Sequence, residues 1–273
     1  MTSRTAHLPT RSVRYLEAGE GQPLLLLHAF PFSADQWLPQ LSRIPRGWRA
    51  VAPDLRGLGG ESPGVPPGDT IGMDTYAGDA LELMAHLDMP RAVVCGLSMG
   101  GYVALAMVRR SVERISGLVL ADTRAAADSA DGRAGRERML ALLGREGPPG
   151  VAREMLPKLL SDRSRREQPD LEDVLKAMIE ANASEGIAAA IRAMKERPDS
   201  MGILGRIACP TLVIVGKEDA LTPPAEAEIL QRGIAGARLH TIPGAGHMSN
   251  LEAPLAFSSA LEGLLGAVEP GRA

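Results

Sequence analysis

Short apolar runs bounded by glycine, proline or aspartate recur along the first half of the chain. Runs that are apolar at every position fit strands of a parallel sheet, because helices cover both faces of such strands. Between two of these runs, Ala77, Leu81 and Met84 fall at helical spacing and predict an amphipathic helix. The predicted strands are residues 12–16, which can pair as a hairpin with the segment before Pro9, and then 24–28, 49–53, 92–95 and 118–121.

The pattern changes near Thr123, and from there to about Ser200 no run predicts a strand. Apolar positions in this stretch instead follow the helical template, with Asp170 as the expected N-cap of one helix and Pro157 as the expected end of another. The helical matches are 136–143, 151–156, 171–179 and 187–194. Strands resume at 211–215 and Arg238–Ile242, and a last amphipathic helix follows at Pro254–Leu265.

This order of elements predicts an α/β fold, with a doubly wound, mostly parallel sheet and a helical cap inserted after the sixth strand. Residues 1–122 are expected to form the first part of the core, 123–200 the cap or lid, and 201–273 the second part of the core. No internal repeat or low-complexity linker separates these parts, so we interpret the helical stretch as an insertion into one core.

Charge and composition exclude several classes of function. Of 273 residues 45% are hydrophobic, and the net charge is −3, so no bulk field favours nucleic acid or anionic lipid. No apolar segment has the length of a membrane span or the form of a secretory signal. Cys95 and Cys209 are expected to be buried free thiols, as in a reducing compartment. We therefore expect a soluble, cytoplasmic protein.

The strongest chemical signal is the sequence Gly-Leu-Ser-Met-Gly at 96–100, between a predicted strand and a predicted helix. This context is typical of a nucleophile elbow, where Ser98 would sit on a strained turn. Gly96 and Gly100 lie two residues from the serine, where a Cβ would collide with the crossing backbone. The pattern predicts Ser98 as a nucleophile.

A serine nucleophile needs a base and a carboxylate that orients the base, in the chain order serine, acid, histidine. His247 lies in a glycine-rich loop after a late strand, whereas His240 lies inside that strand and is interpreted as structural. Asp219 follows the strand 211–215 and is the favoured acid. Glu218 beside it and Asp122, at the end of the strand 118–121, remain open as rivals.

Taken together, these motifs resemble the α/β-hydrolase superfamily over nearly the whole chain. The segments His-Ala-Phe-Pro at 28–31 and Pro-Asp-Leu-Arg-Gly at 53–57 extend the resemblance, most closely to small bacterial carboxylesterases and 3-oxoadipate enol-lactonase-like enzymes. The resemblance implies an oxyanion hole made by the backbone N–H groups of Phe30 and Met99. Ala29 departs from the family, which commonly has glycine there, and this weakens the assignment of Phe30.

The expected reaction is hydrolysis of a carboxylic ester or lactone of a small, largely apolar substrate through an acyl-enzyme on Ser98. Similar scaffolds also hydrolyse C–C bonds or carry out cofactor-free perhydrolysis, and a ligand-binding protein without turnover is a third possibility.

No cofactor is expected, and no zinc spacing occurs. The glycines at 57, 59 and 60 lack the lysine of a phosphate loop. Asp54, Arg56 and His28 are interpreted as structural. Phe30, Phe32 and Trp37 are expected to form an aromatic floor under an aliphatic roof.

Overall fold

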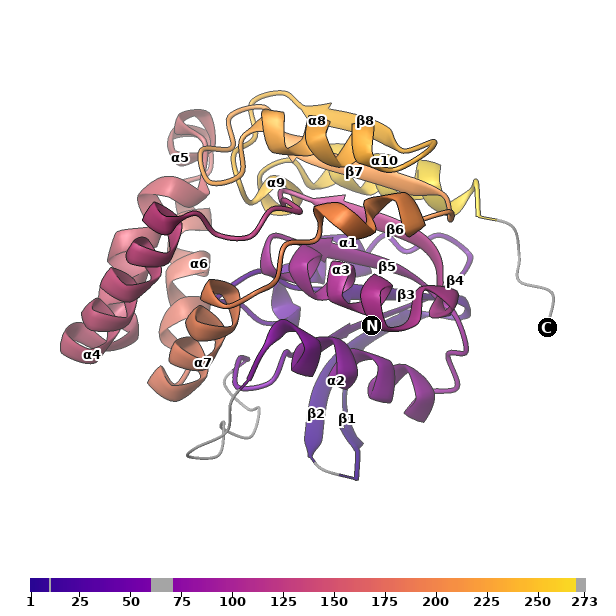
Figure 1. Ribbon diagram of the computed structural model, residues 1–273, viewed down its shortest axis with the longest axis horizontal. Helices are drawn as coiled ribbons and strands as arrows, with labels where there is room; N and C mark the ends of the chain where they lie inside the picture. The colour runs from indigo at the N-terminus through magenta and orange to yellow at the C-terminus, as the bar shows by residue number, and fades with distance from the viewer. Residues whose placement is uncertain (10, 60–70, 269–273) are drawn as a thin grey trace.

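An eight-stranded sheet runs through the centre of the computed structural model, which describes residues 1–9, 11–59 and 71–268 (Figure 1). The strand order is β1-β2-β4-β3-β5-β6-β7-β8. β1 and β2 form the predicted antiparallel hairpin, β2 pairs antiparallel with β4, and every other pair is parallel. The strands are β1 (Thr2–His7), β2 (Ser12–Gly19), β3 (Gly21–Leu27), β4 (Gly47–Pro53), β5 (Ala92–Leu97), β6 (Ile115–Ala121), β7 (Thr211–Gly216) and β8 (Arg238–Ile242).

Burial along the strands follows their place in the sheet. Every residue of β5 and β7 is buried, because each of these strands has a neighbour on both sides and helices on both faces. The edge strands β1 and β8 keep most of their side chains exposed or half-buried. The continuous apolar runs of the sequence thus mark the central parallel strands, and the predicted doubly wound α/β fold is confirmed.

Helices cover the sheet in two groups. In the first group, α2 packs on α3, and α3 packs on β5 and β6. In the second group, α1 packs on α9 and α10, and α10 contacts β6, β7 and β8 (Figure 1). α8 packs on β7 and β8. The core helices are α1 (Leu38–Leu41), α2 (Met73–His86), α3 (Met99–Ser111), α8 (Pro224–Gly233), α9 (Ser249–Glu252) and α10 (Pro254–Leu265), with short 3-10 turns at Ala34–Trp37, Val112–Arg114 and Met201–Arg206.

Four helices lie between β6 and β7 and gather at one end of the molecule (Figure 1). α4 packs on α6 and α7, and α5 packs on α6. Their buried side chains include Leu175, Ile179, Ile187 and Ile191, which the helical pattern of the sequence indicates. We call this group the cap helices: α4 (Ala130–Leu159), α5 (Asp162–Glu167), α6 (Pro169–Glu180) and α7 (Ser184–Lys195).

Two boundary predictions in this region are wrong. Pro157 does not end its helix: α4 continues to Leu159, since a proline in the last turn removes only one helical hydrogen bond. The break lies instead at Gly147, where φ is 64° and the helix axis kinks before two prolines. Asp170 is not an N-cap, because Pro169 already occupies the first turn of α6, a position that proline favours.

The two cysteines are free thiols in different surroundings. Cys95 is fully buried in β5, and burial raises the pKa of its thiol. Cys209 is only half-buried, so the expectation that both are buried is wrong for this residue. Cys209 precedes β7, outside the sheet interior that encloses Cys95.

Candidate active site

Ser98 occupies a tight turn between β5 and α3, as the sequence predicts. Its φ and ψ of 54° and −112° lie outside the regions that L-residues favour. A Cβ at Gly96 would lie 2.2 Å from the carbonyl oxygen of Gly100, and one at Gly100 would lie 2.1 Å from that of Leu27. Both positions therefore require glycine, and the turn lifts Ser98 to the carboxyl end of the sheet.

A continuous set of hydrogen-bonding contacts joins three of the predicted site residues. Ser98 Oγ lies 2.9 Å from Nε2 of His247, and Nδ1 of His247 lies 2.9 Å from Oδ2 of Asp219. Because a carboxylate only accepts, Nδ1 carries the ring proton and Nε2 is free to accept from the serine hydroxyl. His247 and Asp219 are each about 3% exposed, so little water competes for these contacts.

Asp219 is held as an acceptor by several donors. The backbone N–H groups of Leu221 and Thr222 donate to Oδ1, and the Thr222 hydroxyl donates to Oδ2 at 2.6 Å. Burial acts to raise the pKa of Asp219, but the charge and hydrogen bond of His247 and the bonds from Thr222 outweigh burial and lower the pKa. The carboxylate therefore stays ionised beside the imidazole.

The rival acids lie elsewhere. Asp122 directly follows β6 and is fully buried, where it accepts hydrogen bonds from the Gly216 N–H and the Ser249 hydroxyl and has none to His247. Burial, and then the charge of Asp219, raise the pKa of Asp122. Glu218 is exposed. His240 is exposed on the edge strand β8, away from the site.

The two backbone amides expected to form the oxyanion hole have no internal acceptor among the described residues. Within the described ranges, neither the Phe30 N–H nor the Met99 N–H donates a hydrogen bond to another residue. Met99 is the first residue of α3, whose N-terminal amides have no helical partner. Ala29 is not among the residues with positive φ, so its Cβ fits the turn, and its N–H donates to the Gln36 side chain at 2.8 Å.

The residues interpreted as structural from the sequence support the loop after β3, which contains Phe30. His28 is fully buried, its Nε2 accepts from the Leu55 N–H, and its Nδ1 lies 2.8 Å from the Ala29 carbonyl. Burial lowers the pKa of His28 to about 4, so the ring is neutral at pH 7. Asp54 accepts from the Ala34 N–H and from Arg14, and Arg56 pairs with Asp79. Gly60, part of the loop compared above with a phosphate loop, lies outside the described residues.

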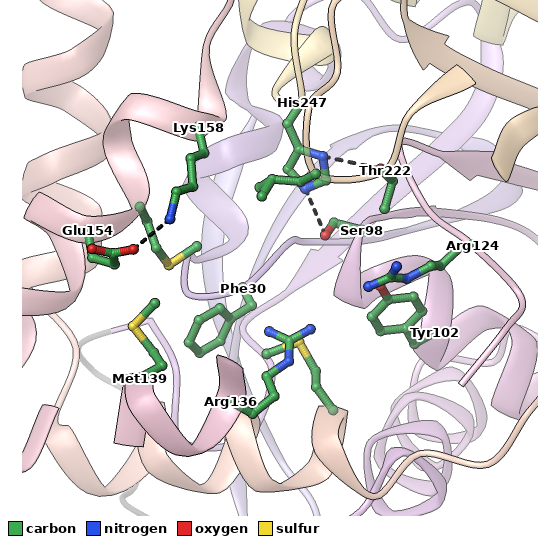
Figure 2. A pocket seen from close by; sticks show the side chains of 13 residues that line it. Phe30, Ser98, Tyr102, Arg124, Arg136, Met139, Glu154, Lys158, Thr222 and His247 are labelled. Carbon is green, nitrogen blue, oxygen red and sulfur yellow. Dashed lines mark hydrogen bonds and ion pairs between the residues drawn. The ribbon is translucent and has the colours of Figure 1, made fainter. Parts of the chain in front are cut away.

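Ser98 and His247 open into a cavity of about 170 Å³ between the core and the cap helices (Figure 2). Of the aromatic floor expected from the sequence, only Phe30 lines the cavity, because Phe32 and Trp37 are fully buried in the core. The aliphatic roof is also incorrect in part, because charged side chains accompany the methionines. Residues outside the cap helices contribute Phe30, Ser98, Tyr102, Arg124, Leu221, Thr222 and His247, and the cap helices contribute Arg136, Met139, Glu154, Met155, Lys158 and Met194.

Sequence reasoning missed the roles of Thr222 and of the charged cavity residues. Thr222 lies three residues after Asp219, the spacing at which a threonine closes a turn on an aspartate. Arg136 gives no such local signal, because its place in the cavity that contains Ser98 depends on how the cap helices pack.

The described residues lack the features of two other kinds of site. Residues 1–9, 11–59 and 71–268 contain no group of three or more histidine, cysteine or acidic side chains placed to hold a metal ion. In the same ranges no helix combines the length and apolar character needed to span a bilayer.

Comparison with known proteins gives a consistent assignment. The family model for the alpha/beta hydrolase fold matches residues 22–254. The 3-oxoadipate enol-lactonase 2 of Acinetobacter baylyi is 27% identical over 242 residues, covering 89% of this chain and 88% of that protein. The pimeloyl-[acyl-carrier protein] methyl ester esterase of Neisseria meningitidis is 28% identical, covering 86% and 90%. The structure of a thermophilic esterase from Thermogutta terrifontis superposes with a TM-score of 0.92 at 37% identity, covering 98% and 99%. The chain therefore belongs to the α/β-hydrolase family.

Proposed function

We propose that the protein is a serine hydrolase that cleaves a small carboxylic ester or lactone through an acyl-enzyme on Ser98. The observation that carries the proposal is the set of contacts from Ser98 through His247 to Asp219, at 2.9 Å each. A serine hydroxyl needs such a base and orienting carboxylate to become a nucleophile. The similarity to an enol-lactonase and to esterases supports ester or lactone substrates.

In the first half of the reaction, Ser98 Oγ attacks the substrate carbonyl while His247 Nε2 takes the hydroxyl proton. Asp219 stabilises the imidazolium that forms. The developing oxyanion accepts hydrogen bonds from the Phe30 and Met99 N–H groups, and each such donor is worth on the order of 3 kcal/mol in the transition state. The imidazolium then gives its proton to the leaving alkoxide, the C–O bond breaks, and the acyl group remains on Ser98.

In the second half, water replaces the alcohol. His247 Nε2 takes a proton from the water as its oxygen attacks the acyl carbonyl, and the same two amides hold the second oxyanion. The intermediate collapses, the acid leaves, and the proton returns to Ser98 Oγ. For a lactone the alcohol and acid are parts of one molecule, and ring opening is the net result.

We propose that residues 123–200 act as a cap over this site. Six side chains of the cap helices line the cavity that contains Ser98 and His247. A cover of this kind limits substrate size and reduces the water around the oxyanion, which strengthens its hydrogen bonds.

The direct test is hydrolysis of p-nitrophenyl esters of short acids by the wild type and by variants. We expect saturable release of p-nitrophenol with an initial burst, and loss of about a thousandfold or more in kcat for Ser98→Ala and for His247→Ala. The exposed Ser42→Ala is the matched control and should match the wild type. A wild type inactive on esters and lactones, but active on β-diketones or in perhydrolysis, would contradict the proposal.

A further inference from the structure

Asn182 lies between the cap helices α6 and α7 (Figure 1) and bonds to two loops of the core. Its side chain is buried, and it is not among the residues that line the cavity around Ser98. Nδ2 donates to the carbonyl groups of Pro31 and Met178 at 2.8 Å each, and Oδ1 accepts from the Gly59 N–H at 2.7 Å. Both ends of the amide are thus engaged, since a rotated amide would place its oxygen against two carbonyls.

The Pro31 carbonyl belongs to the turn that carries the Phe30 N–H. The Phe32 N–H closes this turn on the Ala29 carbonyl at 3.0 Å. His28, whose Nε2 is an acceptor, donates from Nδ1 to the same carbonyl at 2.8 Å. In a planar trans peptide the N–H points away from the carbonyl, so these two bonds fix the direction of the Phe30 N–H within the turn.

The position of this turn relative to Ser98 depends on the bonds at its two ends. Before Phe30, the Ala29 N–H donates to the Gln36 side chain, which belongs to the core. After Phe30, the bond from Asn182 is the only hydrogen bond that Pro31 makes within the described ranges, because proline has no N–H of its own. The core therefore holds one end of the turn, and the cap holds the other.

Close packing of α7 on the loop 54–59 supports the same contact. A Cβ at Gly186, in the first turn of α7, would lie 1.7 Å from the carbonyl oxygen of Gly57, so only glycine permits this approach. The loop 54–59 is in turn bonded to the segment before Phe30, because the Leu55 N–H donates to the buried His28 ring. The junction of α6 and α7 is thus fixed against both core loops.

The geometry points to Asn182 as a positioning residue for the oxyanion hole, through which the docked cap aligns the Phe30 N–H with the oxyanion formed at Ser98. The inference rests on the proposed function and deepens it, since the cap then contributes to stabilising the transition state besides covering the cavity. Asn182 acts through Pro31 from outside the cavity, so its loss should slow the chemical steps and leave substrate binding nearly unchanged.

Steady-state hydrolysis of a p-nitrophenyl ester gives the kinetic test. For Asn182→Ala we expect kcat to fall on the order of 10- to 100-fold and KM to change less than about threefold, because a displacement of about 1 Å at a reacting group can cost a hundredfold. Asn182→Asp keeps an acceptor for the Gly59 N–H, removes the amide donor to Pro31 and should show the same loss.

The matched control is Ile191→Val, which removes one buried methylene from the same helix, α7. It should keep the wild-type kcat and KM. Thermal unfolding of each variant checks that it is folded, and Asn182→Asp, the closer in shape to asparagine, carries the test if Asn182→Ala does not fold.

An amide signal separates this inference from the proposed function. The chain contains three phenylalanines, so protein labelled with ¹⁵N-phenylalanine gives three backbone amide signals, of which Phe30→Leu identifies one. In the free protein, the Asn182 variants should shift the Phe30 signal, and Ile191→Val should leave it in place. A trifluoromethyl ketone that forms a tetrahedral adduct with Ser98 should move the wild-type signal downfield, as a charge-assisted hydrogen bond does, and move it less in Asn182→Ala.

A Phe30 signal unchanged by both Asn182 substitutions would overturn the inference even if esters are hydrolysed. So would an unchanged kcat in both variants, or a loss that falls on KM alone. A wild type that hydrolyses no ester and forms no adduct would contradict the proposed function instead. In that case a shifted Phe30 signal in the free variants would still support the coupling between the cap and the turn, and an unshifted signal would overturn it.

Discussion

The conformation of Ser98 departs from relaxed backbone geometry, and Ser98 is one of three non-glycine residues with positive φ among those described. A non-glycine residue at φ 54° and ψ −112° costs on the order of 1–3 kcal/mol, and the surrounding packing must compensate for it. The close contacts at Gly96 and Gly100 show how the chain accommodates the turn. The same turn places Met99 at the start of α3, where its N–H has no helical partner, so one strained residue positions both the proposed nucleophile and a proposed oxyanion donor.

Substitution of the two candidate acids distinguishes their roles at the scale of single residues. Asp219→Asn removes the acceptor that fixes the His247 tautomer, and we expect kcat/KM to fall by about a thousandfold or more. Asp122→Asn retains an acceptor for the Gly216 N–H, and we expect a loss of less than about tenfold. Steady-state hydrolysis of one ester by both variants measures this. A larger loss for Asp122→Asn would move the acid to that residue.

The neutral state of His28 predicts a pH dependence of stability. Its folded pKa of about 4 lies below the ordinary value near 6.5, so the stabilisation is fully present above pH 6.5 and is lost as pH falls toward 4. His28→Gln keeps an acceptor for the Leu55 N–H but does not titrate. Between pH 7 and pH 4, we expect the wild type to lose roughly 3 kcal/mol more free energy of unfolding than this variant, measured by urea denaturation.

The exposed His240→Gln is the control for that comparison, because its loss should parallel the wild type. Parallel curves for the wild type and His28→Gln would show instead that His28 is not held neutral in the folded protein.

At the scale of elements, Glu252 joins the cap helices to the His247 loop. Its carboxylate accepts from the Ser161 N–H, between α4 and α5, and from the Gly246 N–H, directly before His247. The Met248 N–H donates to the Leu159 carbonyl at the end of α4, which adds a second contact between the same elements. The position of the His247 loop therefore depends on the end of a cap helix.

We expect Glu252→Gln to lower the free energy of unfolding by about 1–3 kcal/mol, since an amide NH2 would face one of two buried N–H donors. It should also increase hydrogen exchange at 159–164 and lower kcat/KM, because the loop that holds His247 loses a contact. Glu167→Gln, an exposed glutamate of α5, is the matched control. If Glu252→Gln were as stable as this control, the contact would have no role in holding the loop.

The accuracy of sequence-based prediction differs among the elements. The central strands and the elbow are predictable because their signals are local: continuous apolar runs, and glycines where the backbone crosses itself. Helix ends in the cap are less predictable, as Pro157 and Asp170 show. A proline tolerated in a last turn and one at the start of a helix differ by tertiary context, which the sequence pattern does not contain.

At the scale of the whole molecule, charge counts do not reveal how the charges are distributed around the candidate site. The net charge is −3, and basic and acidic residues are balanced in the stretch 123–200. Folding nevertheless places Arg124 and Arg136 beside one shared carboxylate at the mouth of the Ser98 cavity. Sequence can thus indicate the reactive groups, whereas the electrostatics of the substrate cavity follow from how cap and core pack together.

Covalent labelling with a fluorophosphonate tests the central claim, that Ser98 is an activated nucleophile, most directly. The probe forms a bond to a serine oxygen only where a base removes the proton, and it requires no knowledge of the natural substrate. We predict that mass spectrometry will find the wild type labelled once, at Ser98, and the folded Ser98→Ala variant unlabelled. Equal labelling of the two proteins, or no labelling of either, would contradict the account.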